Sequence, residues 1–502
     1  MGPRPRPRRH LVSLLMSLDL MDALLGFLGP IFWGLLLLSV LVFVHEGGHF
    51  LAARACGVRV LEFFLGMPCR FNIHHVSKRI GTKFGVTPIL LGGYAEICGM
   101  DPTEVLSAPE VLACIHRHGT VDLDVVSEEL GLALDEVQDA CSLLYGWGSI
   151  VPVPDDTERE QGEGDSQTGF PRAFAAVPRD PKGHTVYDGR AFDRAQATAE
   201  GEPWVPPMSD EEFFELERSH TYVGKGFWAR AFMLVAGIAV NILTGFLLVI
   251  AVYSALGVST PIDANVLGEI AADTPAEQAG LRQGDRVLAV NGERVDSWLG
   301  MLDAFDAVDH EGAVELDVWR PNDIDAAFDH LPFDDYAGSD SWARENGAFL
   351  TIEVSFDEDG MIGINVPTQV VRLNPLQSCQ IAVDNIVATA QSVGSLLNPH
   401  HTMEVLDNST SVVGISVMSA QAAAEGAATF LNFAALISFS LGFMNLLPIP
   451  PLDGGKLVIE AVQAVTRRKV PVKVQTIISM VGIGLFGLLF IYMLGSDIIR
   501  FF

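Results

Sequence analysis

The segment His45-Glu46-Gly47-Gly48-His49 contains the side chains best suited to metal chemistry in this chain of 502 residues. On a helix, histidines four positions apart lie on one face, so both imidazoles can bind the same metal ion. Glu46 points in another direction and can hold a water molecule instead. The spacing therefore predicts His45 and His49 as metal ligands, with Glu46 beside them at the catalytic centre. The alternative is a chance cluster of polar residues at the end of an apolar helix.

The best candidate for a third ligand lies far along the chain. A catalytic zinc site has three protein ligands and one open position, and Asp453 is the carboxylate nearest to the end of the apolar stretch at 426–447. Prolines before it cannot donate helical hydrogen bonds, and glycines after it permit a turn that aims the carboxylate. These residues are Pro448, Pro450, Pro451, Gly454 and Gly455. The sequence thus predicts an unwound segment beside the metal, with Asp453 as the third ligand.

The composition requires both membrane segments and soluble regions. Hydrophobic residues make up 49% of the chain, yet its formal net charge is −30. A bilayer excludes so many carboxylates, so apolar spans must alternate with acidic soluble parts. Stretches long enough to span a bilayer occur at 23–45, 231–256, 426–447 and 474–498. The acidic balance also argues against a nucleic-acid partner.

A short basic loop sets the expected orientation of these spans. The loop at 457–473 contains Arg467, Arg468, Lys469 and Lys473, and loops rich in such residues stay in the cytoplasm. The region 258–400 then lies outside, and the first and third spans both run inward. At about 1.5 Å per residue, each metal motif lies roughly 33–40 Å from the outer surface. Both motifs are therefore expected at one depth, near the cytoplasmic face.

The first residues of the chain oppose this orientation. Arg4, Arg6, Arg8 and Arg9 favour a cytoplasmic N-terminus, whereas Met21, just before the first span, is typical of a start residue. We therefore expect residues 1–22 to be an N-terminal extension, of which 1–20 are dispensable or precede the true start.

The cysteines carry no metal or disulfide signature in their spacing. They form no C-x-x-C pair and belong to no short secreted scaffold. We expect reduced, structurally inert thiols at Cys56, Cys69, Cys98, Cys114, Cys141 and Cys379.

Several motifs together resemble the site-2 protease family of intramembrane metalloproteases, in its bacterial, PDZ-containing, regulator-of-sigma-factor branch. They are H-E-G-G-H at 45–49, G-T-K-F-G at 81–85 with L-G-G-Y at 91–94, and the segment 445–455. A further match at 236–241 occupies the place of the family's A-G-P-x-x-N, although Ile238 replaces the proline. The resemblance leaves out about 101–215.

The resemblance implies a zinc-dependent intramembrane endopeptidase in the bacterial inner (plasma) membrane. Its substrates would be single-span membrane proteins, such as anti-sigma factors or signal-peptide remnants. His45, His49 and Asp453 would hold Zn2+, while Glu46 would take a proton from the attacking water and return it to the leaving amine.

The resemblance also gives two asparagines a role. Asn445 and Asn241 would bind the substrate backbone or the developing oxyanion. The alternative for both is hydrogen bonding between membrane helices.

The implied fold is a polytopic α-helical membrane protein with about four transmembrane helices, a membrane-re-entrant β-hairpin and an extracytoplasmic PDZ (α+β) domain. The hairpin is expected at 81–99, where an exposed edge can add an unwound substrate as a strand; the alternative is an ordinary packing hairpin. The expected boundaries are 23–100 for the first span with the hairpin, 226–257 for the second, 426–456 for the third and 474–502 for the fourth.

The PDZ domain is expected at 258–367. The segment 274–292 predicts a short helix, a Gly-Asp turn, a strand and an Asn291-Gly292 hairpin turn, as in the PDZ signature. Strands near 314–320 and 349–354 should follow, separated by an acidic insertion at about 321–347. The domain either recognises substrates by strand addition or excludes large ones. A connecting amphipathic segment is expected at 368–425.

Residues 101–153 resemble a winged-helix module inserted on the cytoplasmic side, with helices at 109–118, 125–130 and 134–145 and a strand at 148–153. Its would-be recognition helix carries Asp135, Glu136 and Asp139 but no basic residue, so DNA binding is rejected. A contact with a protein regulator and a passive insertion remain alternatives. Residues 154–225 are acidic and are expected to form a flexible linker.

Two other classes of function compete with a protease. An ion transporter would use buried polar groups as a path, but it gives no reason for two metal motifs at the same depth. A non-catalytic PDZ scaffold in the membrane would have no need of Glu46.

Overall fold

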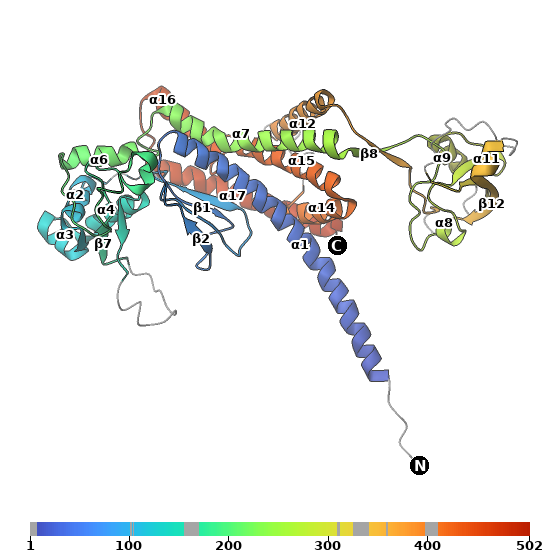
Figure 1. The fold of residues 1–502 in the computed structure, drawn as a ribbon, viewed down its shortest axis with the longest axis horizontal. Helices are drawn as coiled ribbons and strands as arrows, with labels where there is room; N and C mark the ends of the chain where they lie inside the picture. The colour runs from blue at the N-terminus through green and yellow to red at the C-terminus, as the bar shows by residue number, and fades with distance from the viewer. Residues whose placement is uncertain are drawn as a thin grey trace, which may run out of the picture. The chain divides into compact units, whose positions relative to one another are not determined.

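The computed structural model describes residues 8–100, 103, 105–154, 170–308, 312–324, 341–357, 360–396 and 410–501. The chain divides into two units (Figure 1). The larger unit contains Met1–Ile250 and Cys379–Phe502, and the smaller unit contains Ala251–Ser378.

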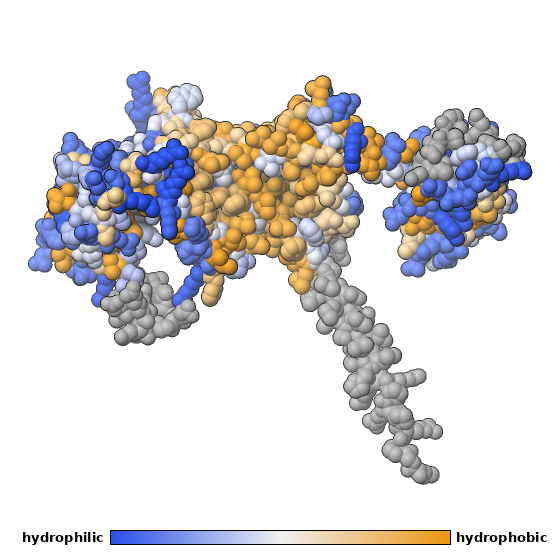
Figure 2. Space-filling view, viewed as in Figure 1, coloured by the Kyte–Doolittle hydropathy of each residue, from blue (hydrophilic) through white to orange (hydrophobic). Residues whose placement is uncertain are grey.

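Four helices of the described chain are long and apolar enough to cross a membrane, which confirms the four expected spans. They are α1 (Arg8–Ala55), α7 (Phe227–Ala251, continued to Leu256), α15 (Ala427–Leu446) and α17 (Val472–Phe501). The surface over these helices is mainly hydrophobic in Figure 2. Helix α1 continues beyond the H-E-x-x-H motif, so the motif lies inside the helix rather than at its end.

A four-stranded sheet follows α1 directly. Its strands are β1 (Val60–Leu65), β2 (Ile73–Val76), β3 (Lys83–Val86) and β4 (Gly93–Ile97), in the order β2-β3-β1-β4. The expected hairpin at 81–99 is wrong in detail, because β3 and β4 do not pair with each other. Strand β1 lies between them, parallel to β3 and antiparallel to β4. Nothing in the sequence of residues 81–99 indicates that both strands pair with β1, which lies earlier in the chain.

Three further helices complete the larger unit around the spans. They are α12 (Pro375–Ser395), α14 (Val412–Glu425) and α16 (Asp453–Thr466). Helix α14 is apolar and packs closely on α1, where a side chain at Gly34 would collide with Ser416. Part of the expected connecting segment is therefore an apolar helix packed against the first span.

The insertion after β4 contains the helices and the strand that the sequence predicts. These are α2 (Ala108–His118), α3 (Leu123–Leu130), α4 (Leu134–Gly146) and β6 (Ile150–Pro152). Two more strands, β5 (Thr120–Asp122) and β7 (Ala173–Ala176), complete an antiparallel sheet with the order β5-β7-β6.

The expectation of a flexible linker at 154–225 is wrong for the part that the structure describes, from residue 170 onward. This part supplies β7, the 3₁₀ helix η1 (Val186–Ala191) and α6 (Asp210–Ser219). Phe174, Trp204 and Phe213 are buried in the same core as α2 and α4. The remaining linker residues, 155–169, lie outside the described chain.

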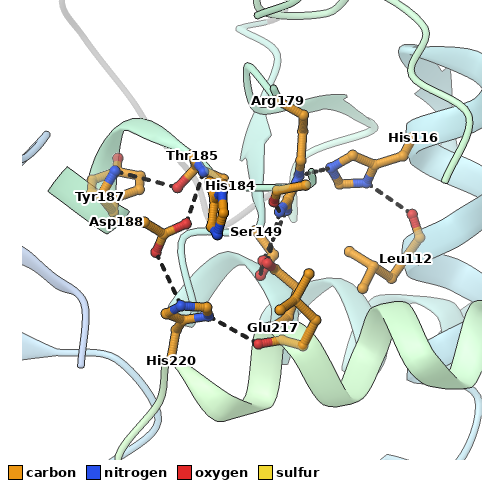
Figure 3. Close-up of polar contacts among 12 residues, drawn as sticks. Leu112, His116, Ser149, Arg179, His184, Thr185, Tyr187, Asp188, Glu217 and His220 are labelled. Atoms are coloured by element: carbon orange, nitrogen blue, oxygen red, sulfur yellow. Dashed lines mark hydrogen bonds and ion pairs between the residues drawn. The ribbon is translucent and has the colours of Figure 1, made fainter. Parts of the chain in front are cut away.

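A buried ion cluster explains why this acidic segment folds (Figure 3). The Glu217 carboxylate is fully buried and accepts hydrogen bonds from Arg179 at 2.7 and 2.8 Å. It also accepts from Arg59 at 2.7 and 3.0 Å. Arg59 also donates to Asp188 at 2.7 and 2.9 Å, and Arg179 donates to His116 at 3.1 Å. Arg59 comes just after α1, so one of the two arginines that pair with the acidic segment lies more than a hundred residues away in sequence, as separations of 129 and 158 show. Arg179 belongs to the segment itself.

The smaller unit contains a second four-stranded sheet, with the order β10-β9-β11-β12. The strands are β9 (Arg286–Val290), β10 (Glu293–Arg294), β11 (Ala313–Pro321) and β12 (Gly347–Ser355). The predicted hairpin turn and the strands near 314–320 and 349–354 are confirmed; Asn291 and Gly292 have φ angles of 49° and 79°. Most of the expected acidic insertion lies outside the described residues.

Short helices and a two-stranded ribbon complete this unit. The helices are α8 (Pro275–Gln278), α9 (Trp298–Asp306) and α11 (Ser341–Asn346). The ribbon pairs β8 (Val258–Pro261) with β13 (Thr368–Val371) in antiparallel register. It brings the two ends of the unit side by side.

Candidate metal centre

Three side chains with metal-binding atoms converge within the membrane helices of the larger unit. Nε2 of His45 and Nε2 of His49 lie 3.0 and 3.1 Å from Oδ2 of Asp453. The two Nε2 atoms lie 3.1 Å from each other. All three residues are buried, although Asp453 is separated from the histidines by more than four hundred positions, 408 and 404. The structure thus brings together the motif and the distant carboxylate.

The hydrogen bonds of His49 favour a cation at this point of convergence. Nδ1 of His49 lies 2.7 Å from the carbonyl oxygen of Met233, which can only accept, so Nδ1 carries the proton. Nε2 of the neutral ring then presents a lone pair toward Asp453 and His45. Ligand atoms on a tetrahedral zinc with bonds of about 2.0–2.2 Å lie roughly 3.3–3.6 Å apart, so a bound ion would move the three atoms apart by a few tenths of an ångström. The observed separations and donor types therefore fit zinc.

Glu46 lies beside this cluster but outside the group of three. One of its carboxylate oxygens is within 4.8 Å of the ligand nitrogens of both histidines, and the residue is half-buried. It is close enough to share a water molecule with the metal without replacing a ligand.

Helix α7 approaches the site with bare backbone. A Cβ atom at Gly237 would collide with Nε2 of His49 and would lie 2.8 Å from Cε1 of His45. A Cβ at Gly48 would lie 2.6 Å from the carbonyl oxygen of Ala236. Small residues allow membrane helices to approach this closely. The two glycines therefore hold α1 and α7 in contact at the level of the histidines.

Asp453 begins helix α16, directly after the proline-rich segment. The carboxylate lies in the first turn, where the partial positive charge of a helix N-terminus stabilises it. The sequence analysis gave Gly454 and Gly455 the role of permitting a turn, but both lie inside the helix. A side chain at either position would collide with backbone atoms of the preceding segment, at Leu446 and Pro450. These glycines permit close packing, which fixes where α16 starts.

Asn241 is fully buried on α7 and contacts His45. Its Nδ2 lies 3.3 Å from Nδ1 of His45, and its Oδ1 is buried without a hydrogen-bond partner in the described chain. The amide oxygen and nitrogen have nearly the same shape, so exchanging them lets Oδ1 accept the Nδ1 proton. That tautomer leaves Nε2 of His45 free for a metal. The contact favours an orienting role over a substrate contact.

Asn445 lies differently. Its side-chain amide donates to the carbonyl oxygen of Leu441, one turn earlier in α15, at 3.0 Å. Within the described chain no hydrogen bond joins it to the three ligand residues.

The sequence analysis missed the carbonyl group of Met233. It lies two turns before Asn241 on the same face of α7, and each supports the Nδ1 atom of one histidine. A backbone carbonyl leaves no signature in residue types. The spacing of Met233 and Asn241 on one helix face is the only local pattern that could have suggested the pair.

A protein-family model decides the classification of the chain. The model, described as Peptidase family M50, matches residues 33–489. The chain belongs to this family. Peptidase family M50 is the site-2 protease family, so the resemblance drawn from the motifs is confirmed.

Curated members of the family match over nearly the whole chain. The zinc metalloprotease RasP of Shouchella clausii is 28% identical over 493 residues, covering 96% of this chain and 100% of the relative. The regulator of sigma-W protease RasP of Bacillus subtilis is 24% identical and covers 95% and 100%. The probable protease eep of Enterococcus faecalis is 25% identical and covers 93% and 98%.

As a member of family M50, the protein is a zinc-dependent intramembrane metalloendopeptidase. Its cofactor is Zn2+, and its helices make it a polytopic membrane protein. The transporter and scaffold alternatives are thereby set aside.

Proposed function

We propose that His45, His49 and Asp453 bind the zinc ion of this M50 peptidase and that Glu46 is its general base. The observation that carries the proposal is the convergence of the three ligand atoms to within 3.1 Å of one another. Burial of two imidazoles and a carboxylate among apolar helices is costly without a bound cation. When bound, zinc lowers the pKa of a coordinated water and polarises the scissile carbonyl.

The protein's own groups then divide the work of hydrolysis. Glu46 takes the proton from the attacking water and later gives it to the leaving amine. Asn241 and the carbonyl of Met233 hold the two imidazoles in the tautomer that leaves Nε2 free. Asn445, at the end of α15, is proposed to bind the substrate backbone near the scissile bond.

Strand β4 is proposed to present the substrate to this centre. It is an edge strand of its sheet within the described chain, and Gly92 before it donates to Oγ of Ser39 on α1 at 3.2 Å. A transmembrane helix must become extended before a peptidase can cleave it, and strand addition to β4 stabilises the extended form.

Exposed apolar side chains around the sheet support a re-entrant position in the membrane. They project from β2, from the residues just before it and from the loop after β3, where water would leave them poorly solvated. The most exposed of them are Phe71, Ile73, Val76 and Leu91.

The substrates are proposed to be single-span membrane proteins, including regulators of sigma factors. This extends to the present chain what the name of the Bacillus subtilis relative says of that protein, regulator of sigma-W protease. Signal-peptide remnants, which are also short apolar spans, are a second substrate group.

The sidedness is proposed from charge. Arg467, Arg468 and Lys469 follow α16, and Lys473 lies at the start of α17. These residues support a cytoplasmic position for the connection between α16 and α17. The metal centre then lies near the cytoplasmic face, and the smaller unit lies outside the cell.

The smaller unit is proposed to be a PDZ domain. It contains the predicted short helix α8, the hairpin at Asn291 and Gly292, and the long antiparallel pair β11–β12.

The insertion is proposed to be a winged-helix-like module that contacts a protein regulator, since its helices and its sheet order β5-β7-β6 agree with that arrangement.

The test compares Glu46→Gln with the unchanged protein in detergent or liposomes. Glu46→Gln should retain as much zinc as the unchanged protein, because the three ligands remain. Cleavage of a membrane-inserted single-span peptide should fall by at least about 10²-fold, the lower range for loss of a general base.

Asp453→Asn is the companion variant and should lose cleavage together with the zinc ion of this centre. Full cleavage by Glu46→Gln, or undiminished zinc in Asp453→Asn, would refute the assignment of the centre.

A further inference from the structure

A second cluster of metal-binding side chains lies in the insertion, apart from the peptidase centre. Cys114 and His118 are one helical turn apart on α2, and Glu129 lies on α3. One ligand atom from each of the three residues lies within 4.8 Å of the other two. Nε2 of His118 and Oε2 of Glu129 are 2.7 Å apart. The cluster thus combines a thiol, an imidazole and a carboxylate from two neighbouring helices.

The cluster extends from the core of the insertion to its surface. Cys114 is fully buried, whereas the side chains of His118 and Glu129 are 41% and 45% exposed. An ion can therefore reach the site from solvent and be held against a buried sulfur. Cys-x-x-x-His alone is no metal signature, because the third ligand comes from α3, which packs against α2.

Without a bound metal ion, the sulfur of Cys114 carries a proton. Burial and the neighbouring Glu129 carboxylate raise the pKa of the Cys114 thiol to about 11. Arg117, paired with Asp210, is the nearby cation and lowers it only in part. The thiol is thus protonated at neutral pH, and a metal must displace that proton to bind the thiolate.

We propose that Cys114, His118 and Glu129 form a second metal site that binds zinc or a similar borderline divalent ion. Three protein ligands of mixed S, N and O type with an open position match the ligands that such ions take. A bound ion would tie α2 to α3. It would thereby stabilise the insertion without any contact to the peptide-cleaving residues.

Cobalt(II) spectroscopy of the full-length protein distinguishes this site from the peptidase centre. The peptidase ligands are nitrogen and oxygen, so only the second site can give a sulfur-to-cobalt charge-transfer band in the near ultraviolet. Titration of the purified protein with Co2+ should produce that band, saturating at one equivalent per chain. Competition with Zn2+ should remove it.

Variants identify the ligands. Cys114→Ser should abolish the band, and His118→Ala should weaken Co2+ binding by about tenfold or more, at least the loss seen for outer-shell partners. His118 is exposed, so its replacement tests the site without disturbing the core. Cys98→Ser is the matched control, since Cys98 is also a fully buried free thiol of the larger unit.

The proposal is supported if Cys98→Ser keeps the band and Cys114→Ser lacks it with unchanged circular dichroism. It is overturned if the unchanged protein shows no sulfur band, if the band survives Cys114→Ser, or if His118→Ala binds Co2+ as tightly as the unchanged protein. None of these results depends on cleavage activity.

Discussion

Asn241 and the carbonyl of Met233 contact the Nδ1 atoms of the two histidines, while the Nε2 atoms face Asp453. One hydrogen bond thus holds the Nδ1 side of each ring, and the Nε2 side is left for the proposed metal ion. Supports of this kind fix ring orientation and ligand basicity. At the scale of single residues, the site consists of the ligands and their partners together.

Replacing Asn241 with alanine should weaken zinc binding. We expect about a 10- to 100-fold loss of zinc affinity, the usual effect of removing such a partner, measured by competition with a chelator. Asn445→Ala is the control, because its amide binds Leu441 in its own helix; it should keep zinc while cleavage decreases. Lost cleavage with unchanged zinc in Asn241→Ala would instead assign Asn241 to the substrate.

Helix α6 carries the buried carboxylate of Glu217, which joins Arg179 of the insertion to Arg59 just after α1. Glu217→Gln would leave Arg59 and Arg179 without their shared partner, and breaking a buried ion pair typically costs 3–5 kcal/mol. We expect a loss of about that size in the unfolding free energy of the insertion, measured by hydrogen exchange.

Glu215→Gln on the same helix is the matched control. The Glu215 side chain is 63% exposed in its pair with Arg218, so we expect a change within about 0.5 kcal/mol. Equal effects of the two substitutions would contradict the role given to the buried cluster.

The same cluster makes the stability of the insertion depend on pH. Burial and the neighbouring Arg179 lower the pKa of His116 from 6.5 to about 3. Between these two pH values His116 is protonated in the unfolded chain but not in the folded chain. The free energy of unfolding therefore falls as pH decreases from 6.5 toward 3. Although burial opposes ionisation, Arg179 and Arg59 hold the pKa of Glu217 well below its ordinary value, which adds a loss in more acidic solution.

Hydrogen exchange of the insertion between pH 7 and pH 4 measures this effect. His116→Gln should flatten the dependence in that range, because glutamine does not titrate and can still accept from Arg179. A slope that is unchanged in the variant would assign the effect to other groups.

At the scale of elements, the sequence predicts the features that depend on residues close together in the chain. The spacing of His45 and His49, the four apolar spans and the hairpin at Asn291 all follow from contacts between near neighbours along the chain. The errors are non-local. Strand β1 separates β3 from β4, and the acidic segment after residue 170 folds because Arg59 neutralises it. Neither effect can be read from the segment in which it occurs.

At the scale of the whole molecule, all residues proposed to act in the metal centre lie in the larger unit. They are the three proposed ligands together with Glu46, Asn241 and Asn445. The ribbon of β8 and β13 opposes Pro261 to Thr368, so residues between them can be replaced with a short turn.

The shortened protein, with a turn in place of residues 263–366, should keep its zinc and cleave a short single-span peptide at a rate within a few-fold of the full chain. If the smaller unit excludes large substrates, the shortened protein should also accept proteins with bulky outer domains. If the smaller unit recognises substrates, natural ones should be cleaved more slowly. Loss of zinc would contradict the independence of the two units.

Gly237 contributes to the centre by having no side chain. The hydrogen that it carries faces the space in which Nε2 of His49 lies, and a single methyl group there would press on the ligand atom itself. The single added methyl group of Gly237→Ala should therefore displace the His49 ring and lower zinc affinity, measured by competition with a chelator, although the substitution changes no polar group.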